Sequence, residues 1–159
     1  MLIFLDTEFT DFPNLICDPI SIGLVDENGR EFYAELIDYR DDACSPFVRQ
    51  NILPLLGIHK NMIKGTRFSV AKNLKEWLEP YRDDCIVCFD YNTDWYLMRD
   101  MLIMLPEEDI PNYLVARNIW GQIDKIRLEH FWVEKELIGW RKHHSLWDAH
   151  GNRAAYLPK

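Results

Sequence analysis

Four acids and one histidine are the residues of this chain whose types and order could do chemistry: Asp6, Glu8, Asp94, His143 and Asp148. Asp6 and Glu8 stand two residues apart at the end of an apolar run, and a β-strand directs such a pair to one face. Carboxylate oxygens are the hard ligands that Mg²⁺ and Mn²⁺ prefer. A histidine, with an ordinary pKa of about 6.5, suits a general base at neutral pH. This combination is what hydrolysis of a phosphodiester by two metal ions requires.

Each acid also has a purely structural interpretation. Asp94 falls in the first turn of an expected helix, where the helix dipole stabilises a negative charge. Asp90 competes with it because it directly follows an expected strand, and we expect only one of the two to reach a metal. Asp148 completes an S-x-x-D helix-start signature that begins at Ser145. Because the acids occur together in one chain, we favour metal ligation.

Apolar periodicity and turn signals predict the elements that must position these side chains. Five strands are expected, at Leu2–Leu5, Ile20–Val25, Glu31–Ile37, Cys85–Phe89 and Tyr113–Ala116. Five helices are expected, at Pro46–Ile52, Phe68–Leu78, Asn92–Met104, Ile119–Leu137 and Ser145–Tyr156. Ser69 and Ser145 are the expected N-caps of two of them. Three antiparallel strands followed by alternating helices and strands indicate an α/β fold with a mixed five-stranded sheet flanked by helices.

Length and composition indicate one globular domain over residues 1–159, with 48% hydrophobic residues. No apolar run is long enough for a membrane span, so no membrane partner is expected. The first strand begins at Leu2, which leaves no room for a signal peptide, and a cytoplasmic location is the expectation. Cys85 and Cys88 have CxxC spacing without a second pair, and we interpret them as thiols of a buried strand.

The net charge of −8 argues against tight, non-specific binding of duplex nucleic acid. The charge is unevenly distributed, however. Residues 117–159 hold 8 Lys and Arg against 5 Asp and Glu, whereas residues 1–116 hold 10 against 21. Bound divalent cations would also offset several of the acids. An enzyme that holds only a few terminal nucleotides therefore remains compatible with the composition.

Three segments resemble the motifs of the DEDDh 3′–5′ exonucleases, a branch of the DnaQ-like, ribonuclease H-like superfamily. The first motif of that family is an apolar strand that ends in D-x-E, and Ile3–Glu8 matches it. The second is an apolar strand and a polar loop, then an acid before an aromatic-apolar run, as in Val87–Met98. The third is H-x-A-L-x-D-A, which His143–Ala149 resembles. The matches span most of the chain in the family's order.

The register of these motifs selects Asp94 over Asp90 and His143 over His144. His144 is expected to precede the cap of the last helix and point elsewhere, so that His144→Ala would be nearly silent. The chain departs from the family pattern at Phe89, Asp90, Thr93 and Ser145. These departures bear on subfamily and substrate more than on the reaction.

The resemblance implies a ribonuclease H-like fold that holds two Mg²⁺ or Mn²⁺ ions through the four acids Asp6, Glu8, Asp94 and Asp148. His143 would then be the general base. The products would be nucleoside 5′-monophosphates, released from the 3′ end of a single-stranded nucleic acid. Phe9 and Thr10, just after the first motif, are candidates to contact the terminal base and sugar, although Phe9 could instead be a core residue.

The compact length is most similar to the short bacterial and phage 3′–5′ exoribonucleases of mycobacterial type, so RNA is the expected substrate. An exodeoxyribonuclease of proofreading type is the first alternative. A non-catalytic nucleic-acid-binding module of the same fold is the second. The six Trp residues and the apolar content leave room for a homodimer interface.

Overall fold

The computed structural model describes residues 1–11, 17–83 and 85–157. Within these residues, six strands form one mixed sheet in the spatial order β4-β3-β2-β1-β5-β6. The strands are β1 (Leu2–Phe9), β2 (Pro19–Asp26), β3 (Glu31–Leu36), β4 (Ile63–Gly65), β5 (Cys85–Phe89) and β6 (Leu114–Asn118). The helices are α1 (Pro46–Asn51), α2 (Arg67–Leu78), α3 (Asn92–Leu102), α4 (Lys125–Glu136) and α5 (Ser145–Ala155).

The sheet combines an antiparallel half with a parallel half. β1, β2 and β3 are antiparallel neighbours, β5 lies parallel to β1, and β6 lies parallel to β5. The predicted α/β fold with a mixed sheet is therefore confirmed, but the expected number of five strands is wrong. The additional strand, β4, pairs parallel with β3 at the edge. Its three residues are too few to show an alternating pattern, so only the pairing with β3 identifies it.

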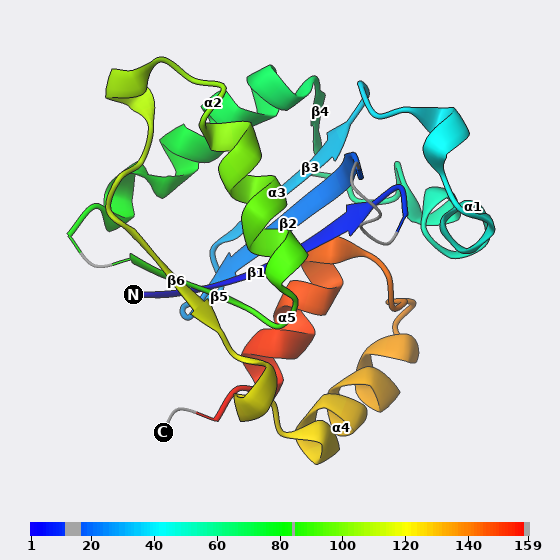
Figure 1. The fold of residues 1–159 in the computed structure, drawn as a ribbon. Helices are drawn as coiled ribbons and strands as arrows, with labels where there is room; N and C mark the ends of the chain where they lie inside the picture. The colour runs from blue at the N-terminus through cyan, green and yellow to red at the C-terminus, as the bar shows by residue number, and fades with distance from the viewer. Residues whose placement is uncertain (12–16, 84, 158–159) are drawn as a thin grey trace.

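Alternation along β1 divides its side chains between two cores. Ile3 and Leu5 pack with residues of α2 and α3 on one face of the sheet. Phe4 belongs to a second core with residues of α5 on the other face, and Figure 1 shows α3 and α5 on opposite sides of the strands. Asp6 and Glu8 follow Phe4 at two-residue steps, so they lie on the face that α5 covers.

The close packing of α5 on the sheet depends on Gly23 in β2. This residue pairs with Asp6 of β1. A Cβ atom at position 23 would lie 2.2 Å from the backbone nitrogen of Leu146, inside the first turn of α5. Backbone on both sides leaves nothing that could move aside, so only glycine lets α5 approach the acids of β1.

Three helix starts differ from the sequence expectation. The helix expected over Ile119–Leu137 is interrupted: a 3₁₀ turn covers Trp120–Gln122, and α4 begins only after Asp124, whose side chain accepts from two backbone N–H groups of the first turn. α2 begins at Arg67 with Thr66, not Ser69, as its N-cap. In α5 the expected Ser145 cap is also wrong, because His144 occupies the N-cap position.

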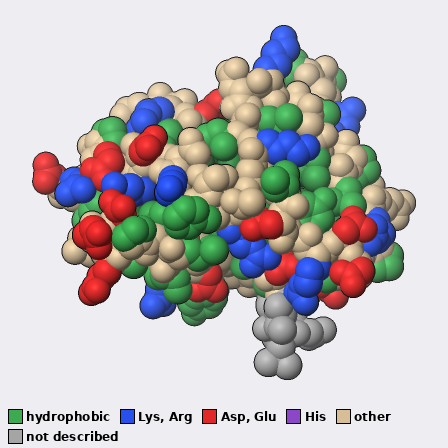
Figure 2. Space-filling model, turned by 90° about the horizontal axis from the view of Figure 1, so that it is seen from above, with side chains coloured by type: hydrophobic (Ala, Val, Ile, Leu, Met, Phe, Trp, Pro, Cys, Tyr) green, Lys and Arg blue, Asp and Glu red, His purple; other side chains and the backbone are tan. Residues whose placement is uncertain are grey.

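The cysteines, the lengths of the helices and the charges at the surface can each be compared with what the composition predicted. Cys85 and Cys88 are buried free thiols, as the sequence predicted. Among the described residues, none of the helices combines the length and the apolar character that a membrane crossing needs. Seen from above, acidic and basic side chains are interspersed over the face that Figure 2 shows, and no continuous basic surface runs across it.

Candidate active site

Three strands that run parallel bring their carboxyl ends to one edge of the sheet. These are β1, β5 and β6, and such edges are where α/β proteins commonly build their sites. Glu8 lies near the end of β1, Asp90 follows β5, and Trp120 follows β6. A pocket of about 620 Å³ opens there, and all three residues line it.

Six acids line this pocket, and five of them, including the four that the sequence predicted, form two close groups. One oxygen from each of Asp6, Asp90 and Asp94 lies within 4.8 Å of the other two, and the same holds for Asp6, Glu8 and Asp148. Asp6 belongs to both groups. Asp90 and Asp94 therefore both lie against Asp6, and the expectation that only one of the two reaches a metal stays a prediction.

Asp90 is held by a residue of α5. Its Oδ1 accepts a hydrogen bond from Nδ2 of Asn152 in α5 at 2.9 Å. The contact ties the segment after β5 to α5, and it turns the Asp90 side chain toward Asp6. In the sequence, the position of Asp90 directly after an expected strand made it a candidate, but the register of the second motif favoured Asp94.

Asp94 reaches the acids from the opposite face of the sheet. It lies in the first turn of α3, and its Oδ1 accepts from both the backbone N–H of Thr7 at 3.2 Å and the Thr7 hydroxyl at 2.7 Å. Thr7 points away from Asp6 and Glu8 along β1, as predicted, and so it can hold Asp94 at the edge. The second oxygen, Oδ2, is buried without a hydrogen-bond partner among the described residues.

Asp148 is positioned by the start of α5. Its Oδ2 accepts from the backbone N–H of His144 at 3.0 Å, which closes the first turn of the helix. Ser145 does not cap this helix; its hydroxyl lies 3.0 Å from that of Ser21 in β2 and fixes the helix to the sheet. The capping signature in the sequence therefore marks the correct helix, and Asp148 keeps the role of its acid, but His144 takes the place of Ser145 at the N-cap.

Burial and mutual repulsion disfavour the charged form of these carboxylates. Desolvation, followed by the charges of its acidic neighbours, raises the pKa of Asp6 well above its ordinary value, and the pKa of Glu8 is raised by the same causes. Burial raises the pKa values of Asp94 and Asp148 to about 7, against the ordinary 3.8. A divalent cation among the acids would remove this repulsion.

His143 stands at the rim of the pocket. It lines the pocket and is exposed, and its ring packs edge-on against Phe47, with 4.9 Å between ring centroids. Its φ of 67° is left-handed, a conformation that His adopts more readily than most residues. Partial burial and the neighbouring Lys142 lower the pKa of the His143 ring, so it is neutral at pH 7.

His144 has a different environment and is not among the residues that line the pocket, and the expectation that His144→Ala leaves kcat nearly unchanged stays a prediction. The side chain is 2% exposed. Its ring is stacked between Tyr33 and Trp147, with centroid distances of 4.5 Å and 4.0 Å. Burial lowers the pKa of His144 to about 4, so the ring is neutral. This stack anchors the segment that carries His143.

Of the two residues proposed to contact substrate, the structure brings only Phe9 to the pocket. Phe9 lines it, and its ring lies roughly parallel to that of Tyr91 at 6.4 Å between centroids. Thr10 is completely buried, and its hydroxyl accepts the backbone N–H of Asp18 at 3.0 Å. The Thr10 assignment is therefore corrected: the side chain has no access to a ligand.

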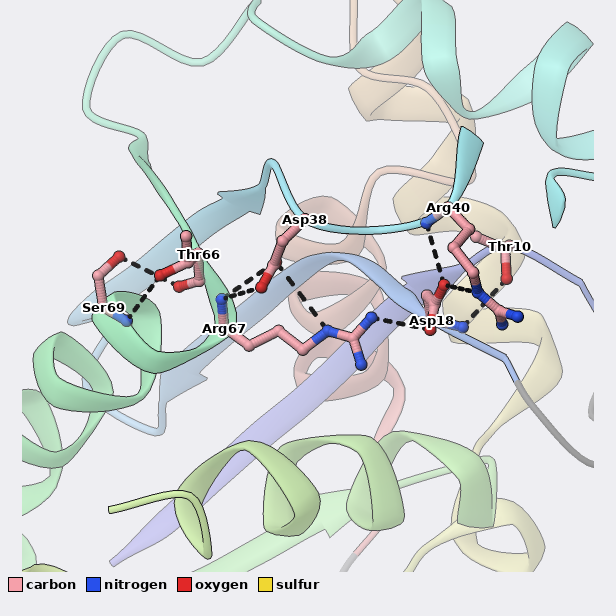
Figure 3. A network of polar contacts seen from close by, with 7 residues as sticks. All are labelled: Thr10, Asp18, Asp38, Arg40, Thr66, Arg67 and Ser69. Atoms are coloured by element: carbon pink, nitrogen blue, oxygen red, sulfur yellow. Dashed lines mark hydrogen bonds and ion pairs between the residues drawn. The ribbon is translucent and has the colours of Figure 1, made fainter. Parts of the chain in front are cut away.

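Thr10 instead belongs to a polar network that holds the end of β1 (Figure 3). Asp18 accepts from the Arg40 side chain at 2.7 Å and pairs with Arg67 at 2.8 Å. Asp38 accepts from the backbone N–H of Arg67 at the start of α2. These contacts join the segments before β2, after β3 and before α2, and so support the strand that delivers the acids.

Several residues of the pocket were not predicted. Phe47 and Ser45 come from the start of α1, whereas Tyr91 and Trp120 follow β5 and β6. Tyr91 and Trp120 carried a usable signal, because residues just after parallel strands gather at one edge. Phe47 carried none, since only the fold brings α1 to this edge.

The residues present fit divalent metal ions. The acid groups supply oxygen ligands only, and Asp94 offers a buried oxygen without a hydrogen-bond partner among the described residues. Burial and the charge of Asp90 raise the pKa of Asp94, and a cation beside it would favour its charged form. Oxygen-only ligand sets select hard cations such as Mg²⁺ and Mn²⁺. The buried acids of this pocket could thus hold a metal.

Metal stabilisation is expected to depend on pH. In the folded, metal-free protein Asp94 and Asp148 retain protons up to about pH 7, against an ordinary pKa of 3.8, so the stability they contribute is complete below about pH 4 and is lost as the pH rises through 7. His144 has the opposite dependence, and comparison with and without cation at each pH cancels it.

We therefore expect Mg²⁺ or Mn²⁺ to raise the melting temperature more at about pH 8 than at about pH 5, where the cation must displace bound protons. Thermal unfolding in EDTA and in each cation measures this. An equal shift at both pH values, or none at either, would contradict metal binding by these acids.

Comparison with known proteins adds a partial likeness. No protein-family model matches the chain. Two curated proteins named 3′–5′ exoribonuclease, from the CDC 1551 / Oshkosh and ATCC 25618 / H37Rv strains of Mycobacterium tuberculosis, are each 35% identical to it over 78 residues. The match covers 49% of this chain and 46% of each relative, so the chain spans about half the length of the curated relatives it matches.

Proposed function

We propose that this protein is a metal-dependent 3′–5′ exonuclease of the DEDDh type, which removes nucleoside 5′-monophosphates from the 3′ end of single-stranded nucleic acid. The observation that carries the proposal is the meeting of acids from β1, α3 and α5 in one pocket. Its volume, about 620 Å³, suits a ligand of nucleotide size. The partial likeness to proteins named 3′–5′ exoribonuclease supports the same reaction.

The residues that would hold the metal ions are Asp6, Glu8, Asp94 and Asp148, and Asp6 belongs to both groups of acids. When bound, two Mg²⁺ or Mn²⁺ ions would supply an activated water and would neutralise charge on the leaving oxygen. Asp90 contacts the same group of acids. Its hydrogen bond to Asn152 gives it a positioning role for the loop that precedes α3.

His143 is the proposed general base. A base must be neutral to accept a proton, and the lowered pKa of His143 keeps a ring nitrogen free at neutral pH. Its place at the rim leaves the ring room to approach a water in the pocket, and the edge-on contact with Phe47 limits where the ring can go. Phe9 offers a ring surface on which the terminal base can stack.

RNA is the proposed substrate, because the matching relatives are named exoribonucleases. DNA is the first alternative. The retention of every acid and of the histidine in one pocket favours catalysis over a module that binds without cleaving.

The test uses RNA and DNA oligonucleotides of one sequence, labelled at the 5′ end, with Mn²⁺, Mg²⁺ or EDTA. We expect stepwise shortening from the 3′ end, faster for RNA, with nucleoside 5′-monophosphate as product and no cleavage in EDTA. Cleavage that survives EDTA would overturn the metal mechanism. Binding of either strand without cleavage would favour the non-catalytic module.

A further inference from the structure

A second hollow adjoins the acid pocket. Its volume is about 600 Å³, and it shares Asp90, Tyr91 and Trp120 with the pocket of the acids. Its remaining lining residues are polar and uncharged: Asn92, Thr93 and Asn118. Tyr91 and Trp120 therefore form a ridge between two hollows of similar size.

The Trp120 backbone is firmly held, whereas its ring is not covered. Oδ1 of Asn118 accepts the backbone N–H of Trp120 at 3.0 Å, and Nδ2 of Asn118 donates to Oδ1 of Asn92 at 2.7 Å. Ile119, which lies between Asn118 and Trp120 in the chain, is completely buried and donates its N–H to the carbonyl of Phe89 at 2.8 Å. The Trp120 side chain nevertheless remains 66% exposed. A large ring on a fixed backbone at the mouth of a pocket is a preformed stacking surface.

Charge distinguishes this surface from an electrostatic groove. Among the described residues that line the two hollows there is no Lys and no Arg, and the only charged side chain in the second hollow is Asp90. A strand that crossed here would gain little from its phosphates. Its affinity would have to come from bases stacked on rings, which requires no cation.

We propose that the nucleotides before the 3′-terminal one leave the acid pocket across this ridge, with one base stacked on the ring of Trp120 and the strand continuing over the amides of Asn92 and Asn118. The proposal rests on the proposed function, and it names the binding site for the part of the substrate that is not cleaved. The continuity of the two hollows through Asp90, Tyr91 and Trp120 is what assigns this path.

The experiment compares a substrate that fills only the acid pocket with one that also crosses the ridge. The p-nitrophenyl ester of a nucleoside 5′-monophosphate carries the terminal nucleotide and a small leaving group, whereas an RNA octanucleotide carries the upstream strand. We expect Trp120→Ala to lower kcat/KM for the octanucleotide by about tenfold or more, mainly through KM, because one base–aromatic stack is worth about 5- to 150-fold in affinity. The ester, which lacks the upstream strand, should lose much less of its kcat/KM than the octanucleotide, because it meets Trp120 only where that residue lines the acid pocket.

Two control variants complete the comparison. Trp120→Phe retains a ring and should recover most of the octanucleotide activity. Tyr96→Ala removes another exposed aromatic side chain, which lies on α3 and outside the lining of both hollows. It should change kcat/KM for neither substrate. Equal losses on both substrates, or no loss on either, would overturn the proposal; so would a Trp120→Ala protein that is altered only in its oligomeric state.

Salt provides an independent readout. One phosphate–cation contact in a single strand contributes a slope of about −0.7 to log K against log salt concentration. We expect KM for the octanucleotide to vary less steeply than this, and a slope several times steeper would show that the strand runs over a basic surface instead. If the unmodified protein cleaves neither substrate, the proposed function fails; if it cleaves both, only the path across the ridge is at issue.

Discussion

The Asp6→Asn protein is expected to have lost its cleavage activity. Asp6 is the residue that both groups of acids share, so its loss would weaken both proposed metal positions at once. Charge stabilisation by bound metals is worth several kcal/mol, on the order of 10³-fold or more in rate. Initial rates on a 5′-labelled RNA oligonucleotide, at saturating Mn²⁺, measure the effect.

The same substitution should leave the fold intact. Desolvation and four neighbouring acids raise the pKa of Asp6, so the amide removes an unfavourable buried charge. In EDTA at neutral pH the melting temperature of Asp6→Asn should therefore equal or exceed that of the unmodified protein. Asp100→Asn, at an exposed acid on α3, is the matched control and should change neither property. An Asp6→Asn protein that cleaves at the original rate would refute the metal site.

For His143→Asn we expect kcat to fall by about 10²- to 10⁴-fold, which is the usual contribution of general-base catalysis. Asparagine is preferred to alanine here because it tolerates the left-handed backbone at this position. Metal affinity, measured by titration with Mn²⁺, should hardly change, because the proposed ligands of the ion are carboxylates and do not include His143. The acidic limb of the pH–rate profile should be lost with the ring.

His144→Asn is the matched control one residue along the chain. It removes the ring stacked between Tyr33 and Trp147 but supplies a good N-cap for α5. We expect a lower melting temperature and a kcat closer to that of the unmodified protein, the reverse of the His143→Asn result. A greater loss of kcat at position 144 than at position 143 would show that His143 is not the base.

Local features of the chain were sufficient to predict the elements that deliver the acids. The apolar run before Asp6 specifies a strand, and the two-residue spacing to Glu8 puts both acids on one face whatever surrounds them. The buried run Cys85–Phe89 and the helix that begins near Ser145 are equally local patterns. A spacing of this kind depends only on backbone geometry, which is why it could be interpreted without the fold.

Features that depend on contacts between distant segments could not be predicted in this way. Asp90 joins the acids because Asn152, 62 residues away, turns it toward them. Thr10 is buried because Asp18 and its arginine partners close over it. No local pattern records such partners, so the sequence could rank these residues only by resemblance or by position.

The two adjacent histidines show most clearly which features follow from the local sequence and which depend on the tertiary structure. The sequence determined that a histidine pair precedes a helix bearing an acid, and motif register chose His143. Only the tertiary structure decided that His144 is a buried stacking residue, because Tyr33 belongs to a strand more than a hundred residues earlier in the chain. It also decided that Trp120 stays exposed beside the pocket, since the parallel pairing of β5 with β6 brings the residues after both strands to the same edge. Strand spacing and helix periodicity are properties of neighbouring residues, whereas burial and proximity are properties of the packed chain.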